Sequence, residues 1–201
     1  PVIIGLEWEL LEGASERKAQ RDILKNNPGV KAGVLVRSAD IAVMGLMGPK
    51  QKKPAAPSGA ALLALANQDA QSRGTGQSSS IEDNQWIVVE KIADDQYWVV
   101  DIKDGVPLPG ADIVLTYEGV RDYFDDMLEA GGFKVFTTDV DIQDAVDQKA
   151  TIINKSAGEI IADIEKPSRG NLKTVSGIDP MIVIVIAVFV ALVGGFFGWD
   201  Y

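Results

Sequence analysis

The chain contains no cysteine and no histidine among its 201 residues. The first absence excludes disulfide bonds, a thiol nucleophile and cysteine-ligated zinc, and the second excludes a histidine general base or a histidine-dependent triad. Positive charge is also scarce, since 19 Lys and Arg residues stand against 29 Asp and Glu residues and leave a formal net charge of −10. This balance argues against broad nucleic-acid binding, which depends on neutralising phosphates.

The common phosphate-binding motifs are absent as well. Neither G-x-x-x-x-G-K-[ST] nor G-x-G-x-x-G occurs in the sequence. An actin-like ATPase would need Asp-x-Gly turns, but Ile3-Ile4-Gly5 lacks the acid, and Asp101-Ile102-Lys103-Asp104-Gly105 is also what an ordinary hairpin turn produces. We expect no nucleotide cofactor, and the alternative that stays open is a membrane-tethered actin-like ATP-binding protein.

Carboxylates gather in two acidic runs. They are Asp122, Asp125, Asp126 and Glu129 in the first run, and Asp139, Asp141, Asp144 and Asp147 in the second. The second run begins like a calcium-binding EF-hand loop but lacks its glycine and its closing glutamate. We interpret both runs as solvated faces and expect no metal and no catalytic residue, so the chain is not expected to be an enzyme. A membrane-anchored acidic domain that binds Ca²⁺ remains a third hypothesis.

One long uncharged run lies near the end of the sequence. Met181 to Gly198 reads MIVIVIAVFVALVGGFFG, eighteen residues without a charged or polar side chain. As a helix this run would be about 27 Å long, close to the hydrocarbon thickness of a bilayer. Trp199 and Tyr201 follow where an interfacial aromatic belt would lie. We therefore predict one transmembrane helix over 180–199, with the lipid bilayer as a partner.

The flanking charges predict how this helix is oriented. Lys166, Arg169 and Lys173 precede the run, whereas the only charge after it is Asp200. By the positive-inside rule the N-terminal domain is then cytoplasmic and Tyr201 lies outside. Three glycines form a face that lets two membrane helices approach closely and are candidate helix-packing residues: Gly194, Gly195 and Gly198.

Before residue 165, strand-like and helix-like segments alternate. Runs of β-branched and aromatic residues predict strands at 2–10, 30–37, 40–48, 86–92, 97–103, 106–116 and 133–138. Capping residues and apolar stripes predict helices at 16–26, 59–68, 117–130, 141–148 and 156–165. The order favours an α+β domain over 1–165, with a mixed sheet, flanking helices and mobile loops at about 49–57 and 70–84. An actin-like or RNase H-like half is one form of this class, and residues 166–179 are predicted to be a juxtamembrane linker.

Charge is distributed unevenly along the chain. Residues 1–60 carry a net charge of +3, residues 61–165 carry −14 and residues 166–201 carry +1. A domain with one basic end and one strongly acidic end suits docking against a basic protein partner. The candidate partner-binding residues are Arg17, Lys18, Arg21, Lys25, Asp122, Asp125, Asp126 and Glu129.

A set of short motifs occurs in a characteristic order. Near the start, Gly5-Leu6-Glu7-Trp8 is followed by the helical segment SERKAQRDIL and the Ala/Leu-rich segment GAALLALANQ. Further on, Tyr97-Trp98-Val99-Val100 precedes an Asp104-Gly105 turn and Pro109-Gly110-Ala111-Asp112. An acidic helix, a linker and one apolar span complete the order. This arrangement resembles the PilO family of type IVb pilus accessory proteins, which are encoded with thin-pilus and conjugative-pilus systems.

The resemblance implies a bitopic component of the bacterial inner membrane that scaffolds a pilus or related secretion machine. Its implied partners are the pilus assembly ATPase, the inner-membrane platform proteins and further copies of itself in a homo-oligomer, with no catalytic role. The family continues into a periplasmic region, whereas this sequence stops at Tyr201. We therefore expect the periplasmic part to lie beyond the residues given.

Overall fold

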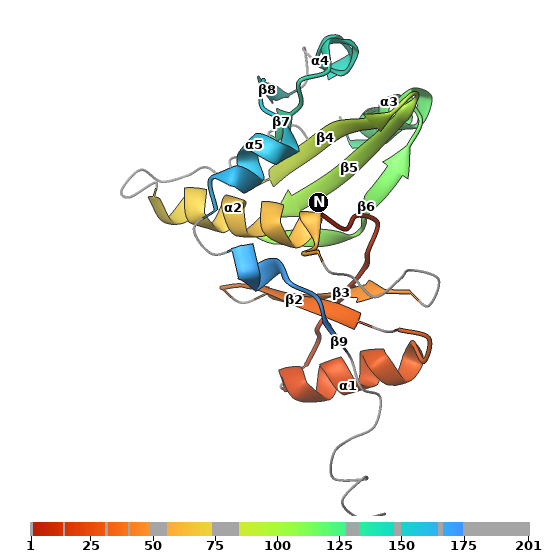
Figure 1. Cartoon of the computed structure of the whole chain (residues 1–201), viewed down its shortest axis with the longest axis vertical. Helices are drawn as coiled ribbons and strands as arrows, with labels where there is room; N and C mark the ends of the chain where they lie inside the picture. The colour runs from red at the N-terminus through yellow and green to blue at the C-terminus, as the bar shows by residue number, and fades with distance from the viewer. Residues whose placement is uncertain are drawn as a thin grey trace, which may run out of the picture.

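The computed structural model describes residues 2–13, 15–30, 32–39, 41–48, 56–73, 85–127, 133–146, 150–164 and 167–174. These residues form a mixed α+β structure built on two sheets (Figure 1). The predicted α+β class is therefore confirmed, whereas the one mixed sheet that we predicted is replaced by two sheets, of which the second is mixed. Within the described part of the chain, no helix has the length and apolar character needed to span a bilayer. The predicted span at 180–199 and its three glycines lie outside the described residues.

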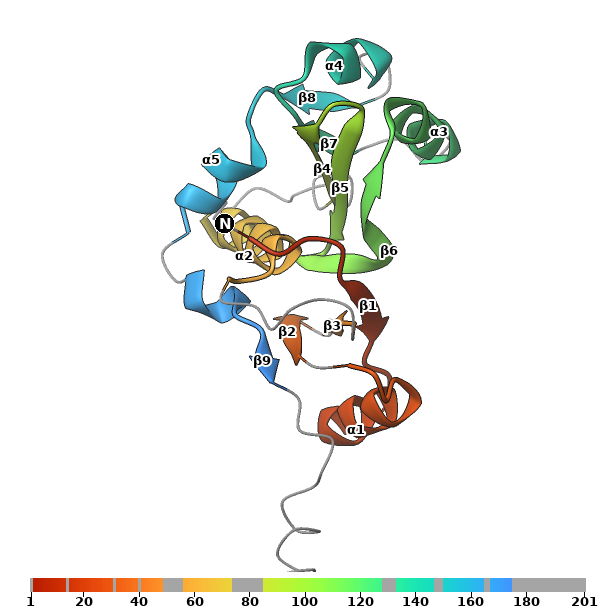
Figure 2. The same ribbon diagram turned by 45° about the vertical axis from the view of Figure 1, so that its right-hand side comes forward.

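The first sheet has the strand order β1-β3-β2-β9 and is antiparallel throughout. Its strands are β1 (Glu7–Leu10), β2 (Ala32–Ser38), β3 (Ile41–Met47) and β9 (Lys173–Thr174). Helix α1 (Glu16–Asn26) covers one face, and helix α2 (Gly59–Arg73) lies on the other side (Figures 1 and 2). The amphipathic α1 directs Ala19 toward the sheet and leaves its charged side chains exposed.

The second sheet has the order β6-β5-β4-β7-β8. Its strands are β4 (Gln85–Ala93), β5 (Gln96–Lys103), β6 (Val106–Leu115), β7 (Lys134–Phe136) and β8 (Thr151–Ile153). The first three form an antiparallel meander, and β7 and β8 are added parallel to β4. Helices α3 (Tyr117–Met127), α4 (Val140–Val146) and α5 (Ala157–Ala162) connect or follow these strands.

Local chemistry explains several element boundaries. Asp104 and Gly105 both have positive φ, 51° and 77°, as the two-residue turn between β5 and β6 requires. Thr116 and Ser58 each accept a hydrogen bond from a backbone N–H in the first turn of the helix that follows. Strand β6 tolerates its two prolines because it lies at the edge of the sheet.

Two apolar cores lie on opposite faces of the second sheet. One contains Trp8, Val88 and Trp98 and joins both sheets through α2. The other lies between the second sheet and helices α3 and α4, and includes Phe124 and Ile142. Figure 2 shows α2 and α5 on one side of this sheet and α3 on the other. Because the first core is shared, the two sheets are packed together.

The structure differs from the sequence predictions at several elements, including the strand predicted at 2–10, which begins only at Glu7. Helix α2 continues to Arg73, so the first residues of the loop predicted at 70–84 are helical. The short strand β8 was not predicted. Residues 167–174, predicted as part of a linker, instead form the 3₁₀ turn η2 (Pro167–Gly170) and strand β9. Elements of two to four residues are too short to show a hydrophobic period, and this explains why the pattern did not reveal them.

Candidate functional site

The carboxylate of Asp112 on β6 lies where the two sheets meet and is only 3% exposed. One oxygen accepts the backbone N–H of Gly5 at 2.7 Å and the indole N–H of Trp98 at 2.8 Å. The other accepts the backbone N–H of Leu6 at 3.0 Å and the indole N–H of Trp8 at 3.2 Å. We call these five residues the Asp112 cluster. Four N–H donors from both sheets satisfy a buried carboxylate that would otherwise be costly to remove from water.

The backbone around Gly5 is shaped to serve this carboxylate. Gly5 has φ +72°, in the left-handed region that glycine adopts without steric cost. Two successive N–H groups then point at one anionic group, as in the backbone concavities that bind anions. The segment is held in place by Ile3, whose N–H donates to Pro57 O at 2.8 Å and whose carbonyl accepts the N–H of Gly59 at 2.8 Å.

Both tryptophans of the cluster lie against glycines. A Cβ at Gly45 would come within 2.9 Å of the Trp8 ring, and a Cβ at Gly59 within 2.5 Å of the Trp98 ring. Trp8 and Trp98 are each 2% exposed. Both indoles are therefore packed as core residues of the folded domain.

A second buried carboxylate, Asp101 on β5, lies between the sheet and α3. Gln85 Nε2 donates to its two oxygens at 3.0 and 2.9 Å, and the Tyr123 hydroxyl donates at 3.3 Å. Burial raises the pKa of Asp101 to about 6, against the opposing effect of these hydrogen bonds. Burial, and then the nearby Asp101 carboxylate, raise the pKa of Tyr123 above its ordinary value.

The Asp104-Gly105 turn, which the sequence left open as a phosphate-loop candidate, is covered by α2. The side-chain amide of Gln68 donates to Gly105 O at 2.6 Å and to Arg37 O at 2.8 Å. A Cβ at Gly105 would come within 2.6 Å of Gln68 Cγ. The turn therefore serves as a contact between the second sheet, α2 and the end of β2.

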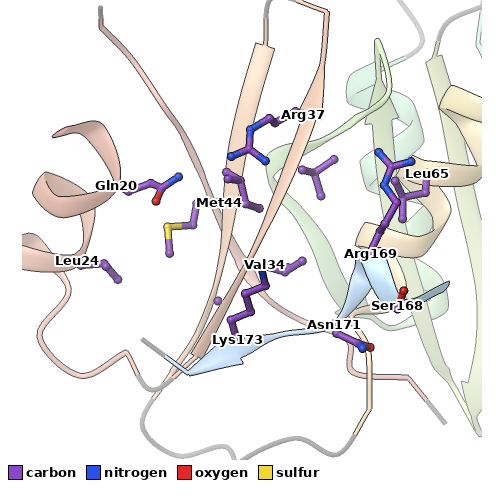
Figure 3. Close-up of a pocket in the computed structure, with 13 residues that line it drawn as sticks. Gln20, Leu24, Val34, Arg37, Met44, Leu65, Ser168, Arg169, Asn171 and Lys173 are labelled. Carbon is purple, nitrogen blue, oxygen red and sulfur yellow. The ribbon is translucent and has the colours of Figure 1, made fainter. Parts of the chain in front are cut away.

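The largest cavity that we describe opens beside β2 and has a volume of about 800 Å³. Its charged lining residues, among those the structure describes, are all cations: Arg37, Arg169 and Lys173. Figure 3 shows Arg37 and Met44 on the side of the sheet that faces α1, and Arg169 and Leu65 on the side of α2. We call this the basic cavity. Arg37 also pairs with Glu16 on α1 and lowers the pKa of that carboxyl.

A smaller cavity of about 490 Å³ lies between α3 and α4. Its lining includes Asp125, Asp141 and Asp144, together with Arg121. The structure thus brings together residues from the two acidic runs of the sequence. Within the described part of the chain, no group of three acidic side chains is arranged to hold a metal ion.

The eight candidate partner-binding residues separate into two distant groups. Four are exposed on α1, opposite the face that contacts the sheet: Arg17, Lys18, Arg21 and Lys25. Asp122 and Asp125 are exposed on α3. Asp126 belongs to α3, but its side chain is not among the parts that the structure describes, and Glu129 lies outside the described residues. Figure 1 shows α1 and α3 at opposite ends of the molecule, so the two charged groups do not form one site.

A family model described as pilin accessory protein (PilO) matches residues 4–201. The chain belongs to the PilO family of pilin accessory proteins. Among curated protein sequences, the comparison finds no match.

Solved structures add information about the fold of this PilO-family chain. The crystal structure of the cytoplasmic domain of BfpC matches with a TM-score of 0.50 and 11% identity, covering 88% of each chain. A protein from Bacteroides thetaiotaomicron, described as having an actin-like ATPase fold and unknown function, matches with a TM-score of 0.39 and 10% identity, covering 80% of this chain and 70% of that one. The BfpC match indicates a shared fold.

The motifs by which the chain resembles PilO proteins meet in the Asp112 cluster. Gly5 and Trp8 belong to the first motif, Trp98 to the hairpin motif and Asp112 to the last. The sequence did not predict this meeting. The available signal was an aspartate inside an otherwise apolar strand, because aspartate is depleted in strands unless it has specific partners.

Proposed function

We propose that this chain is a non-enzymatic, bitopic inner-membrane scaffold of a type IVb pilus or a related secretion machine. Its described domain is cytoplasmic and docks the assembly ATPase and the platform proteins. Several copies, held side by side by their membrane spans, strengthen individually weak contacts by avidity. Membership of the pilin accessory family and the fold shared with a domain described as cytoplasmic support this proposal.

The observation that carries the proposal is the position of the family-motif residues in the structure. Their residues surround a carboxylate that is buried and fully hydrogen-bonded, with all four donors coming from the chain itself. A catalytic carboxylate must reach a substrate, whereas this one ties two sheets together. Such a cluster stabilises one rigid shape, which is what a docking scaffold requires.

The competing hypothesis is a membrane-tethered actin-like ATP-binding protein. The Asp104-Gly105 turn is the phosphate-loop candidate in the second sheet, and Gln68 occupies the space beside it. Calorimetry of the full chain in neutral detergent, titrated with ATP and Mg²⁺, separates the two hypotheses. The scaffold predicts no binding heat at micromolar ATP, and saturable micromolar binding would replace it with the ATPase hypothesis.

The docking function is tested by copurification. The full chain, solubilised in neutral detergent, should retain the assembly ATPase or a platform protein encoded with the same pilus system. Cross-linking of the intact machine should join the described domain to the same protein. If neither method finds a contact with either partner, the docking proposal is wrong.

A further inference from the structure

One edge of β2 lacks a strand neighbour over most of its length. Strand β9 pairs with β2 only through Ala32 and Gly33, while β3 pairs along the whole of the other edge. From Val34 to Ser38, the described part of the chain places no strand beside β2 on the β9 side, but Arg37 O already accepts a hydrogen bond from Gln68 Nε2 at 2.8 Å. The three residues before it, Val34 to Val36, correspond to about 10 Å of open edge. Such an edge can accept an added strand from another chain.

The fold holds the chain away from this edge. Before β9, the η2 turn is fixed to α2, because Gly170 O accepts the N–H of Ser58 at 2.9 Å. Gly170 is buried, and a Cβ there would come within 2.6 Å of Leu62 Cδ2. This contact turns the chain toward α2 just where it would otherwise continue along β2. The edge is therefore left open by a specific packing arrangement.

The open edge lies in the basic cavity. Residues 34–37 of β2 line the cavity, with Arg37 and Met44 on the α1 side and Arg169 on the α2 side (Figure 3). Lys173 contributes a further cation from the end of β9. Cations thus flank the strand on both of its faces. A strand added here would direct alternate side chains to the two faces, and each face offers a cation and an apolar surface.

We propose that this edge binds an extended acidic segment of a partner protein, which adds as a further strand beside β2. The backbone groups of Val34 to Val36 would supply the pairing, and Arg169 and Lys173 would select acidic side chains, while Arg37 is already paired with Glu16 on α1. The cations are spread over two faces of a strand, an arrangement that suits a polymer better than a small phosphate. This inference rests on the proposed docking function and names the kind of segment that docks.

The probe for the test is a fluorescein-labelled, end-capped eight-residue peptide of alternating glutamate and valine. Anisotropy is measured with the full chain in neutral detergent. The peptide should bind, and Arg169→Glu and Lys173→Glu should each weaken binding at least fivefold. The matched control, Lys91→Glu, makes the same charge change on the exposed side chain of Lys91 in β4, outside the basic cavity, and should alter binding less than twofold. A lysine–valine peptide should not bind.

Strand addition is tested by methylating alternate backbone nitrogens of the same peptide, which removes pairing donors and keeps the charge. Two peptides are compared, one methylated at the odd and one at the even backbone nitrogens, and one of the two should bind at least tenfold more weakly than the unmethylated peptide. Equal binding of both methylated peptides would overturn the inference, and so would an equal loss of binding in Lys91→Glu. Displacement of the peptide by millimolar ATP or inorganic phosphate, or no binding at 1 mM peptide, would also overturn it. Melting curves of the variants that match the parent's exclude unfolding as the cause.

The same variants separate this inference from the docking function itself. If Arg169→Glu/Lys173→Glu loses the copurifying partner that the parent and Lys91→Glu retain, the open edge is its binding site. If the double variant retains the partner, docking stands and the acidic-segment inference fails. If the double variant changes only self-association of the chain, the occupant is a second copy and the inference of a partner segment is wrong.

Discussion

Trp8 and Trp98 donate their indole N–H groups to opposite oxygens of the same carboxylate, that of Asp112. Trp8 lies on β1 of the first sheet and Trp98 on β5 of the second. The pair therefore joins two sheets through one shared acceptor. Disturbing the acceptor or either donor should weaken both sheets together.

Replacing Asp112 with asparagine should destabilise the fold by about 2–4 kcal/mol. The substitution replaces one carboxylate oxygen with an amide nitrogen, which cannot accept the N–H hydrogen bonds that this oxygen accepts. Chemical denaturation of the chain in neutral detergent, followed by tryptophan fluorescence, measures the change. The matched control is Asp122→Asn on the exposed face of α3, expected to alter stability by less than about 0.5 kcal/mol. Similar effects of the two variants would contradict the structural role of the cluster.

Trp8→Phe and Trp98→Phe should each cost about 1–3 kcal/mol, since each removes an N–H donor to a buried carboxylate and retains an aromatic ring. Their effects should not add, because both donors act on Asp112, and a double-mutant cycle should give a coupling of at least about 0.5 kcal/mol. Trp86→Phe serves as the control, since Trp86 is half-buried and contacts the Phe136 ring with centroids 4.5 Å apart. Strict additivity would show that the two indoles act independently.

Gly170→Ala should destabilise the chain by about 1–3 kcal/mol, because the added Cβ would overlap the buried side chain of Leu62. Gly158→Ala is the matched substitution: it lies in α5, where a Cβ would have its nearest neighbour at 3.9 Å. That variant should gain up to about 1 kcal/mol from better helix propensity. Amide hydrogen exchange should show faster exchange in β9 for the first variant only. Loss of stability in both variants would argue against a specific contact at Gly170.

The stability of the chain should depend on pH through Asp101. Its pKa in the fold is about 6 against an ordinary value of 3.8, so the folded state binds the proton more tightly. Protonation of Asp101 stabilises the fold fully below about pH 4. As the pH rises from there to about 6, this stabilisation is lost and the free energy of unfolding falls by up to about 3 kcal/mol. Asp101→Asn should remove this part of the pH dependence. If the variant and the parent have parallel stability profiles between pH 4 and 7, the assignment to Asp101 is wrong.

The predicted membrane topology can be tested because these 201 residues contain no cysteine. Single variants Lys18→Cys and Tyr201→Cys would each carry one thiol. In intact spheroplasts, a membrane-impermeant maleimide should label Tyr201→Cys and should label Lys18→Cys only after lysis. Labelling of Lys18→Cys before lysis would reverse the predicted orientation.

The sequence predicted elements whose signal is local and missed those fixed by distant contacts. The stripe through Val120 and Phe124 identified α3, and both side chains are buried as expected. The β5–β6 turn followed from its Asp104-Gly105 pair. Strand β9, by contrast, depends on pairing with Ala32 and Gly33, which no local pattern encodes. The basic cavity was missed for the same reason, because only the fold brings Arg37 and Arg169 to the lining of one cavity.

The place of β9 in the chain has a consequence for biosynthesis. A ribosome delivers residues in order, and N-terminal parts generally fold first. Here β1 needs Asp112, and the first sheet receives its last strand only when residues 173–174 emerge. These residues stand just before the apolar run that begins at Met181. Completion of the first sheet and emergence of the apolar run from the ribosome therefore fall within the same short interval of translation.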